Sequence, residues 1–179
     1  MKKSLLLCGL LFCLSASLCG QGIRHVKGIK SVDVLYGFNK YGNSVNIGFV
    51  NYFSEKIYGK VNLFNAELTQ EVVVSETRTL DLDFQRLGVD ILGAYTGINF
   101  NEVVFINGIG GLTLTYNQFK DSEVDFDSKI KPGIAGGVEI EVFPIDRIAI
   151  ISNFIQKYTL GEEYSDTRYY INFGLRINF

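Results

Sequence analysis

The last 11 residues of the chain alternate without a break between large apolar or aromatic side chains and mostly small or polar ones. The apolar set consists of Tyr169, Ile171, Phe173, Leu175, Ile177 and Phe179. Strict alternation places every second side chain on one face, which is the pattern of a β-strand. A tilted strand needs about ten residues to cross a bilayer, whereas strands of soluble sheets have a mode of about five or six. The pattern predicts a membrane-crossing strand, and its aromatic-ended apolar face is the expected assembly signal.

The amino terminus has the charge pattern of a secretory signal peptide. Two lysines precede an uncharged run from Ser4 to Leu18, which is long enough for a signal peptide and too short for a membrane span. We expect cleavage after Gly20, with a cut after Cys19 as the alternative, so that residues 1–20 are removed. Lipidation of Cys19 is a further alternative, although the large Leu18 precedes it.

The mature chain, residues 21–179, is expected to form one β-barrel domain. All three cysteines lie within the first 19 residues, so the exported chain has no disulfide to stabilise it. No run of about 18 apolar residues follows the signal segment, and no transmembrane helix is expected. A closed barrel is the remaining way to cross a membrane, because lipid offers no partners to unpaired backbone groups.

Strand-forming segments recur along the whole mature chain, and helical periodicity is not sustained after residue 29. They predict eight strands, near residues 30–39, 44–53, 57–65, 83–95, 102–116, 130–142, 147–158 and 167–179. An even number of strands closes a barrel. The expected fold is therefore all-β, an eight-stranded antiparallel transmembrane β-barrel of the outer-membrane type. Some segments change phase, near Arg86, Gly110 and Ser152, which a β-bulge or a misplaced boundary would explain.

The connections between the expected strands alternate in length after the first hairpin. Short ones are expected at residues 54–56, 96–101 and 143–146. Long ones are expected near residues 66–82, 117–129 and 159–166. Residues 65–83, 117–129 and 159–166 together contain 12 acidic and 3 basic residues. Bacterial barrels place short turns in the periplasm and long loops outside, so the acidic end is expected to face the exterior.

Alternation alone does not decide which face of each strand points inward. If the apolar face meets lipid, the inward face holds charged residues from five strands, namely Asp33, Lys60, Asp90, Glu139, Glu141 and Arg176. Eight strands leave an interior just wide enough for side chains, so these groups are expected to pair into a plug that closes the barrel. If the apolar face points inward instead, the chain is a soluble lipocalin-like carrier. The length of the last strand favours the membrane barrel.

Aromatic residues near the strand ends are expected to form the interfacial belts of the membrane wall. They are Tyr36, Phe53, Tyr58, Tyr95, Phe143 and Tyr158. Because the chain has no Trp, Tyr and Phe would fill the whole role.

Catalytic patterns are missing from the sequence. The single histidine, His25, lies ahead of the first strand on the expected periplasmic side, so a serine hydrolase is not expected. Glu139 and Glu141 lie two apart on one strand face but lack a cleft, and ion pairing is preferred to acid–base catalysis. The chain is therefore expected not to be an enzyme.

Ligand-binding patterns are also weak, and no cofactor or metal is expected. Acidic residues in one loop could gather calcium, but the turn-glycine position of a calcium loop holds Phe126, and a solvated loop is preferred. These loop residues are Asp121, Glu123, Asp125 and Asp127. With 17 basic and 19 acidic residues, the chain lacks the basic face that nucleic-acid binding requires.

Glycine and aromatic motifs follow one another in a recognisable order along the mature chain. They are Gln21-Gly22-Ile23-Arg24, Lys27-Gly28-Ile29, Ile91-Leu92-Gly93-Ala94-Tyr95, Gly108-Ile109-Gly110-Gly111-Leu112, Gly133–Glu141, Asp146-Arg147 and Phe173–Phe179. Over essentially the whole mature chain, this pattern resembles the TraO proteins of Bacteroidetes conjugative transposons. The resemblance implies a non-catalytic component of a conjugative DNA-transfer apparatus in the outer membrane of the donor.

The sequence thus predicts a structural or interaction protein of the outer membrane that serves conjugative transfer. Its expected partners are outer-membrane lipid, the barrel-assembly machinery and other proteins of the conjugation apparatus. One alternative is a general small barrel for adhesion or envelope stability. The other is the periplasmic lipocalin-like carrier.

Overall fold

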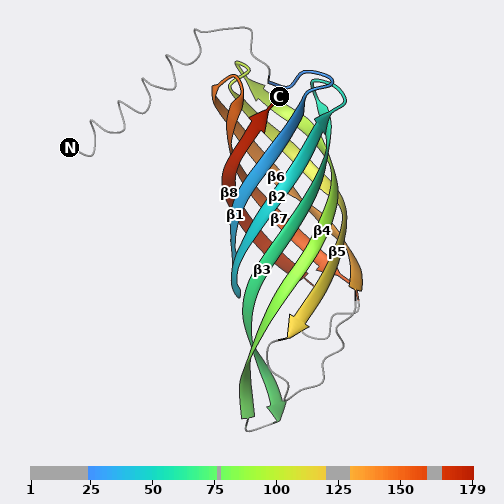
Figure 1. Cartoon of the computed structure of the whole chain (residues 1–179), viewed down its shortest axis with the longest axis vertical. Helices are drawn as coiled ribbons and strands as arrows, with labels where there is room; N and C mark the ends of the chain where they lie inside the picture. The colour runs from blue at the N-terminus through green and yellow to red at the C-terminus, as the bar shows by residue number, and fades with distance from the viewer. Residues whose placement is uncertain (1–23, 76–77, 120–129, 161–166) are drawn as a thin grey trace, which may run out of the picture.

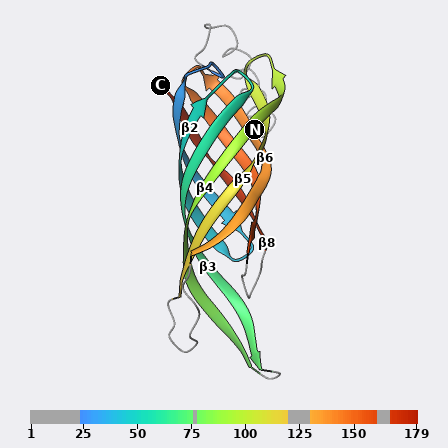
Figure 2. The same cartoon turned by 90° about the vertical axis from the view of Figure 1, so that its right-hand side faces the viewer.

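Eight antiparallel strands form a closed barrel in the computed structural model, which describes residues 24–75, 78–119, 130–160 and 167–179 (Figure 1). They are β1 (Lys30–Asn39), β2 (Gly42–Tyr52), β3 (Ile57–Ser75), β4 (Arg78–Phe100), β5 (Val104–Phe119), β6 (Ile130–Ile145), β7 (Ile148–Thr159) and β8 (Thr167–Asn178). Each strand pairs with its neighbours in the chain, and β1 closes the barrel on β8 (Figure 1). Figure 2 shows the same barrel turned by 90°. The predicted fold is confirmed.

No helix in the described ranges is long and apolar enough to cross a bilayer. The expected signal peptide at residues 1–20 lies outside the described residues, so its cleavage stays a prediction.

The two ends of the barrel differ in their connections. The carboxyl terminus and the connections 53–56, 101–103 and 146–147 lie together at the top of Figure 1, which we call the short-turn end. One of these turns is tight, because Asn101 and Glu102 have φ angles of 51° and 57° and Asn99 Oδ1 accepts a hydrogen bond from the Glu102 amide at 2.8 Å. The opposite end, where β3 meets β4 and β5 leads towards β6, is the long-loop end.

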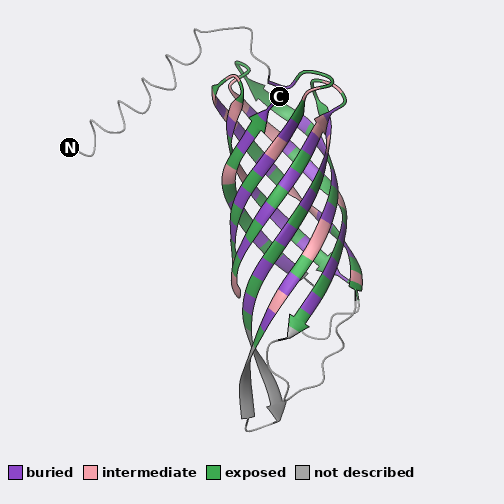
Figure 3. Cartoon of the chain, in the orientation of Figure 1, coloured by how far each residue is buried: buried purple, intermediate pink, exposed green. Residues whose placement is uncertain are grey.

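Burial alternates residue by residue along the strands, as the purple and green bands of Figure 3 show. Outward side chains are mostly large and apolar, and on β8 they are Tyr169, Ile171, Phe173, Leu175 and Ile177. Many buried inward side chains are charged or carry amides, such as Asp33, Asn107 and Arg176. A lipocalin-like carrier needs the reverse orientation, so that alternative is wrong. The outward face is the apolar wall that a membrane barrel presents to lipid.

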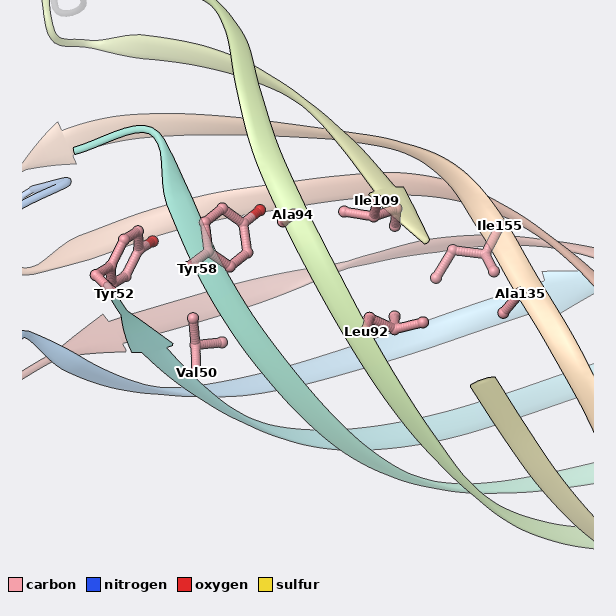
Figure 4. Close-up of a cluster of buried hydrophobic side chains, with 8 residues drawn as sticks. All are labelled: Val50, Tyr52, Tyr58, Leu92, Ala94, Ile109, Ala135 and Ile155. Atoms are coloured by element: carbon pink, nitrogen blue, oxygen red, sulfur yellow. The ribbon is translucent and has the colours of Figure 1, made fainter. Parts of the chain in front are cut away.

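Apolar clusters also occupy parts of the interior, and they explain the apparent phase changes in the sequence. Figure 4 shows the largest cluster among the described residues, formed by Val50, Tyr52, Tyr58, Leu92, Ala94, Ile109, Ala135 and Ile155. The described register shifts fall between Val73 and Ser75, Thr96 and Ile98, and Val142 and Ile145. Neither a β-bulge nor a misplaced boundary therefore explains the phase changes near residues 86, 110 and 152, because all three positions lie inside continuous strands. The backbone keeps its alternation there, while inward apolar residues interrupt the pattern of hydropathy.

Two of the six aromatic residues expected in the interfacial belts lie inside the barrel. Tyr58 and Phe143 are fully buried, because they share the inward phase of Lys60 on β3 and Glu141 on β6. The other four are exposed on the outside, namely Tyr36, Phe53, Tyr95 and Tyr158. The belt prediction is therefore wrong for the two inward residues.

The long connection predicted at residues 66–82 is also wrong, because β3 and β4 continue through most of it. Their pairing runs on from Leu68↔Phe84 to Ser75↔Arg78, past the point where β2 begins opposite Leu68. Figure 1 shows this hairpin reaching beyond the long-loop end of the barrel. Acidic residues count against a strand only where it crosses lipid, and the β-branched residues of this segment favour extended backbone.

Candidate functional site

One arginine joins two other strands, β1 and β6, across the lumen. Arg176 on β8 donates from Nε and Nη2 to the two carboxylate oxygens of Asp33, at 2.6 and 2.8 Å. Its Nη2 also reaches Glu139 Oε1 at 2.8 Å, and its Nη1 lies 2.7 Å from Glu141 Oε1. All four side chains are fully buried. The planar guanidinium has five N–H donors in a fixed fork, which allows it to bind several carboxylates at once.

A lysine links two of these carboxylates from another side. Lys60 Nζ on β3 lies 2.6 Å from Asp33 Oδ2 and 2.8 Å from Glu139 Oε2. The Tyr58 hydroxyl donates to Glu139 Oε1 at 2.7 Å. Buried carboxylates are tolerated only when they are paired and hydrogen-bonded. Asp33, Glu139 and Glu141 each have at least one cationic partner within hydrogen-bond distance. The structure thus brings together five of the six charged residues predicted for the lumen, which we call the ion network: Asp33, Lys60, Glu139, Glu141 and Arg176.

The sixth residue, Asp90, forms a separate pair that the sequence did not reveal. Lys157 Nζ on β7 lies 2.9 and 2.7 Å from the two oxygens of Asp90, and Thr113 donates to the same carboxylate at 2.7 Å. The ammonium also stands 3.4 Å from the ring centroid of Phe64. The alternation gave no signal for Lys157, because its neighbour Gln156 is polar as well and points outward.

The segment ahead of β1 folds into the short-turn end of the barrel. His25 is 5% exposed, its ring stacks on Phe105 with centroids 3.9 Å apart, and its Nε2 lies 3.1 Å from Glu141 Oε2. Arg24 pairs with Asp146 at 3.1 Å and donates to the backbone carbonyl of Glu102. This segment therefore closes the mouth of the barrel above the ion network. Sequence reasoning left His25 outside the barrel, because no periodicity precedes the first strand.

His25 also lies between a hydroxyl and a carboxylate, the two partners that a hydrolase histidine needs. Its Nδ1 is 3.2 Å from Thr96 Oγ1, while Glu141 contacts the other ring nitrogen. Thr96 Oγ1, however, donates its proton to Asn107 Oδ1 at 2.7 Å, and the threonine is buried. A nucleophile must reach a substrate and give its proton to the histidine. The arrangement is thus that of a packed hydrogen-bond network.

The acidic residues of the lumen do not form a metal site. Among the described residues, no group of three or more histidine, cysteine, aspartate or glutamate side chains is placed to hold a metal ion. The carboxylates of the ion network are instead bound by Arg176 and Lys60. The loop acids considered as calcium ligands, residues 121–127, lie outside the described residues.

The residues expected to signal assembly form the outward apolar face of the closing strand. The Phe179 amide donates to the Lys30 carbonyl at 2.9 Å, which extends the β8–β1 pairing to the last residue. Phe179 itself is 64% exposed and continues the outward apolar row of β8. Its role in assembly stays a prediction.

Comparison with solved structures identifies the fold. The outer membrane protein OprG from Pseudomonas aeruginosa matches with a TM-score of 0.67 at 11% identity, over 89% of this chain and 99% of that one. The chain has the fold of an outer-membrane β-barrel. Neisserial surface protein A has a TM-score of 0.64 at 13% identity, over 84% of this chain and 96% of its own. Ail, the attachment invasion locus protein of Yersinia pestis, has a TM-score of 0.56 at 17% identity, over 86% of this chain and 100% of its own.

At these identities the likeness to solved structures extends to the fold alone. No family model matches the sequence, and no curated protein matches it closely. The resemblance to TraO proteins therefore stays a prediction.

Proposed function

We propose that this chain is a closed barrel of the outer membrane with a structural and interaction role. The single observation that carries the proposal is the ion network, in which Arg176 and Lys60 bind three carboxylates across the lumen. A conducting pore needs water along its axis, whereas the interior of an eight-stranded barrel is narrow enough for side chains to fill. With the lumen occupied, the surfaces left for function are the lipid-facing wall and the two ends.

Closure predicts that the purified protein does not conduct ions in a planar lipid bilayer at neutral pH. The physical reason is that the ion network fills the lumen and His25 covers it at the short-turn end. A porin inserted in the same bilayer is the control for membrane quality. Stable, stepwise channel openings of the wild-type protein would contradict the proposal.

Within this proposal, the finer function we favour is a component of a conjugative DNA-transfer apparatus. Its support is the resemblance of the sequence motifs to TraO proteins, and its partners would be other proteins of that apparatus. The β3–β4 hairpin, which extends past the long-loop end, offers such partners a surface outside the membrane.

An in-frame deletion of the gene in the donor is expected to lower conjugation frequency by several orders of magnitude. The reason is that a structural component of the transfer apparatus is needed in the cell that assembles it. The measurement is the number of transconjugants per donor, with the recipient unchanged. Complementation in trans restores transfer if the loss is due to this protein alone.

Unchanged transfer in the deletion strain would contradict the conjugation role and leave the closed barrel intact. The function would then be adhesion or envelope stability, the second candidate. What favours this candidate is the fold shared with Ail, whose name describes attachment and invasion. Adhesion to host cells and survival in bile salts, measured with the same deletion strain, would distinguish these two roles.

A further inference from the structure

Two side chains hold the segment ahead of β1 in the mouth of the barrel. Arg24 pairs with Asp146 at 3.1 Å, and the His25 ring inserts among aromatic rings of the lumen. The segment ends at Gly28, whose φ angle of 88° is one that glycine adopts without strain. Arg24 and His25 therefore decide whether the segment stays docked. The rings around His25 are those of Tyr52, Tyr58, Phe105 and Phe143.

The first ring nitrogen of His25, Nδ1, faces atoms that can only accept a hydrogen bond from it. It lies 3.2 Å from the Glu55 carbonyl oxygen and 3.2 Å from Thr96 Oγ1. The Thr96 hydroxyl already donates its proton to Asn107 Oδ1 at 2.7 Å. The orientation of that amide is fixed in turn, because Asn107 Nδ2 donates to Glu141 Oε1 at 2.6 Å. Nδ1 must therefore carry a proton.

The second ring nitrogen, Nε2, faces a carboxylate, and lies 3.1 Å from Glu141 Oε2. The same carboxylate accepts from Asn107, lies 2.7 Å from Arg176 Nη1, and accepts from the Tyr52 hydroxyl at 3.3 Å. An adjacent arginine and further donors favour the ionised form of a carboxylate, which only accepts hydrogen bonds. Nε2 must therefore donate as well. A histidine that donates from both nitrogens is an imidazolium ion.

The ion network also needs one more positive charge than its own members provide. Three of its members are carboxylates and two are cations, namely Asp33, Glu139, Glu141, Lys60 and Arg176. A net charge in a closed lumen is costly, and a protonated His25 makes the network neutral. The neighbouring ion pairs do not supply this charge, because each is neutral in itself. These pairs are Asp90–Lys157 and Arg24–Asp146.

The other charged groups near the ring are either exposed or engaged elsewhere. A cavity of about 150 Å³ beside His25 is lined in part by the exposed acids Glu55 and Glu102, and the exposed Lys27 and Lys56 lie on the adjoining segments. Exposed charges are screened by water and salt, so the buried carboxylate of Glu141 dominates at the ring. The remaining buried arginines lie against Phe84 and have interactions of their own, namely Arg86 and Arg168.

We propose that the proton on His25 holds the amino-terminal segment in the mouth of the barrel, so that docking depends on pH. The docked ring needs both of its protons, whereas a histidine in water changes its charge between pH 5 and 8. Low pH therefore favours the docked segment. Rising pH weakens docking, because a ring that loses a proton turns a lone pair towards an oxygen acceptor. The inference goes beyond the proposed function, and the ion network still fills the lumen when the segment is released.

Nitrogen-15 NMR of the imidazole ring tests the protonation directly, because His25 is the single histidine of the chain. In the folded barrel, purified without a histidine tag, both ring nitrogens are expected to carry protons at pH 7. A peptide of residues 21–30 is the reference, because its histidine is mostly neutral at that pH. Glu141→Gln leaves two carboxylates and two cations in the network and is expected to return the ring to the neutral form. A neutral ring in the wild-type barrel would overturn the proposal.

A nitroxide label on Val26→Cys reports docking, because Val26 is 47% exposed next to His25 and residues 21–179 contain no cysteine. The mobile fraction of the label is expected to rise severalfold from pH 6 to pH 8.5. In the labelled His25→Gln variant this pH response is expected to disappear. Asp146→Asn is the matched control, because it weakens the Arg24 contact and is expected to keep the pH response.

The label gives three results that would count against the proposal. They are equal mobility of the wild-type label at both pH values, a pH response retained in His25→Gln, and a response lost in Asp146→Asn. Each variant is first checked for the heat-modifiable folded band, so a failure to fold is separated from a failure to dock. Because conductance measures closure and transfer frequency measures the conjugation role, a negative result here leaves both proposals untouched.

Discussion

Replacing Arg176 with alanine is expected to lower the free energy of unfolding by about 3–5 kcal/mol, the usual cost of removing one partner of a buried ion pair. The variant leaves Asp33, Glu139 and Glu141 in a closed lumen, with Lys60 shared between two of them. Burying carboxylates without enough partners is far more costly than losing the pair itself. Urea unfolding of the detergent-folded barrel, followed by circular dichroism, measures the change.

Three further variants separate this penalty from a general effect of arginine removal. Arg147→Ala deletes an exposed arginine in the β6–β7 turn and is expected to change stability little. Arg176→Gln combined with Glu139→Gln removes one of the stranded carboxylates, so it is expected to cost less than Arg176→Gln alone. If Arg176→Ala lowers the free energy of unfolding by less than about 1 kcal/mol, which is the range of surface ion pairs, the ion network does not stabilise the barrel as expected.

The inward orientation of the lumen side chains could be predicted, because side chains along a strand alternate with a period of two. Once one residue of a strand points inward, every second residue does the same, which placed Glu139 with Glu141 on one face. The partners across the lumen could not be predicted in this way. They depend on the stagger between strands, so the sequence did not reveal that Asp90 meets Lys157 and not Arg176.

The inward aromatic residues and the length of the β3–β4 hairpin were missed, because an apolar or polar side chain can be accommodated in more than one environment of a barrel. Tyr58 and Phe143 are apolar in the main, yet they point inward and pack around His25, with ring centroids 5.8 and 6.2 Å from its ring. The acidic segment 66–82 suggested a solvated loop, although β3 and β4 pair through most of it, and backbone pairing by itself does not require apolar side chains. In a membrane barrel, the hydropathy of a side chain indicates contact with lipid only where the residue lies within the bilayer and points outward from the barrel.

Phe179→Ser is expected to reduce the amount of folded protein in the outer membrane severalfold. The terminal aromatic completes the outward row of β8, and its backbone closes the barrel against Lys30. If the barrel-assembly machinery reads this end of the chain, removal of the aromatic ring impairs recognition before folding begins. The measurement is the ratio of heat-modifiable folded band to total protein in outer-membrane fractions.

The control must remove an equal aromatic surface from a strand that does not end the chain. Phe154→Ser serves this purpose, because Phe154 faces outward on β7 and is 47% exposed. We expect it to leave more folded protein than Phe179→Ser, while Phe179→Tyr keeps the ring and assembles normally. Refolding of Phe179→Ser in detergent, without cellular machinery, is expected to match wild type. Equal losses in the two serine variants, or a failure to refold in detergent, would assign the effect to stability and not to recognition.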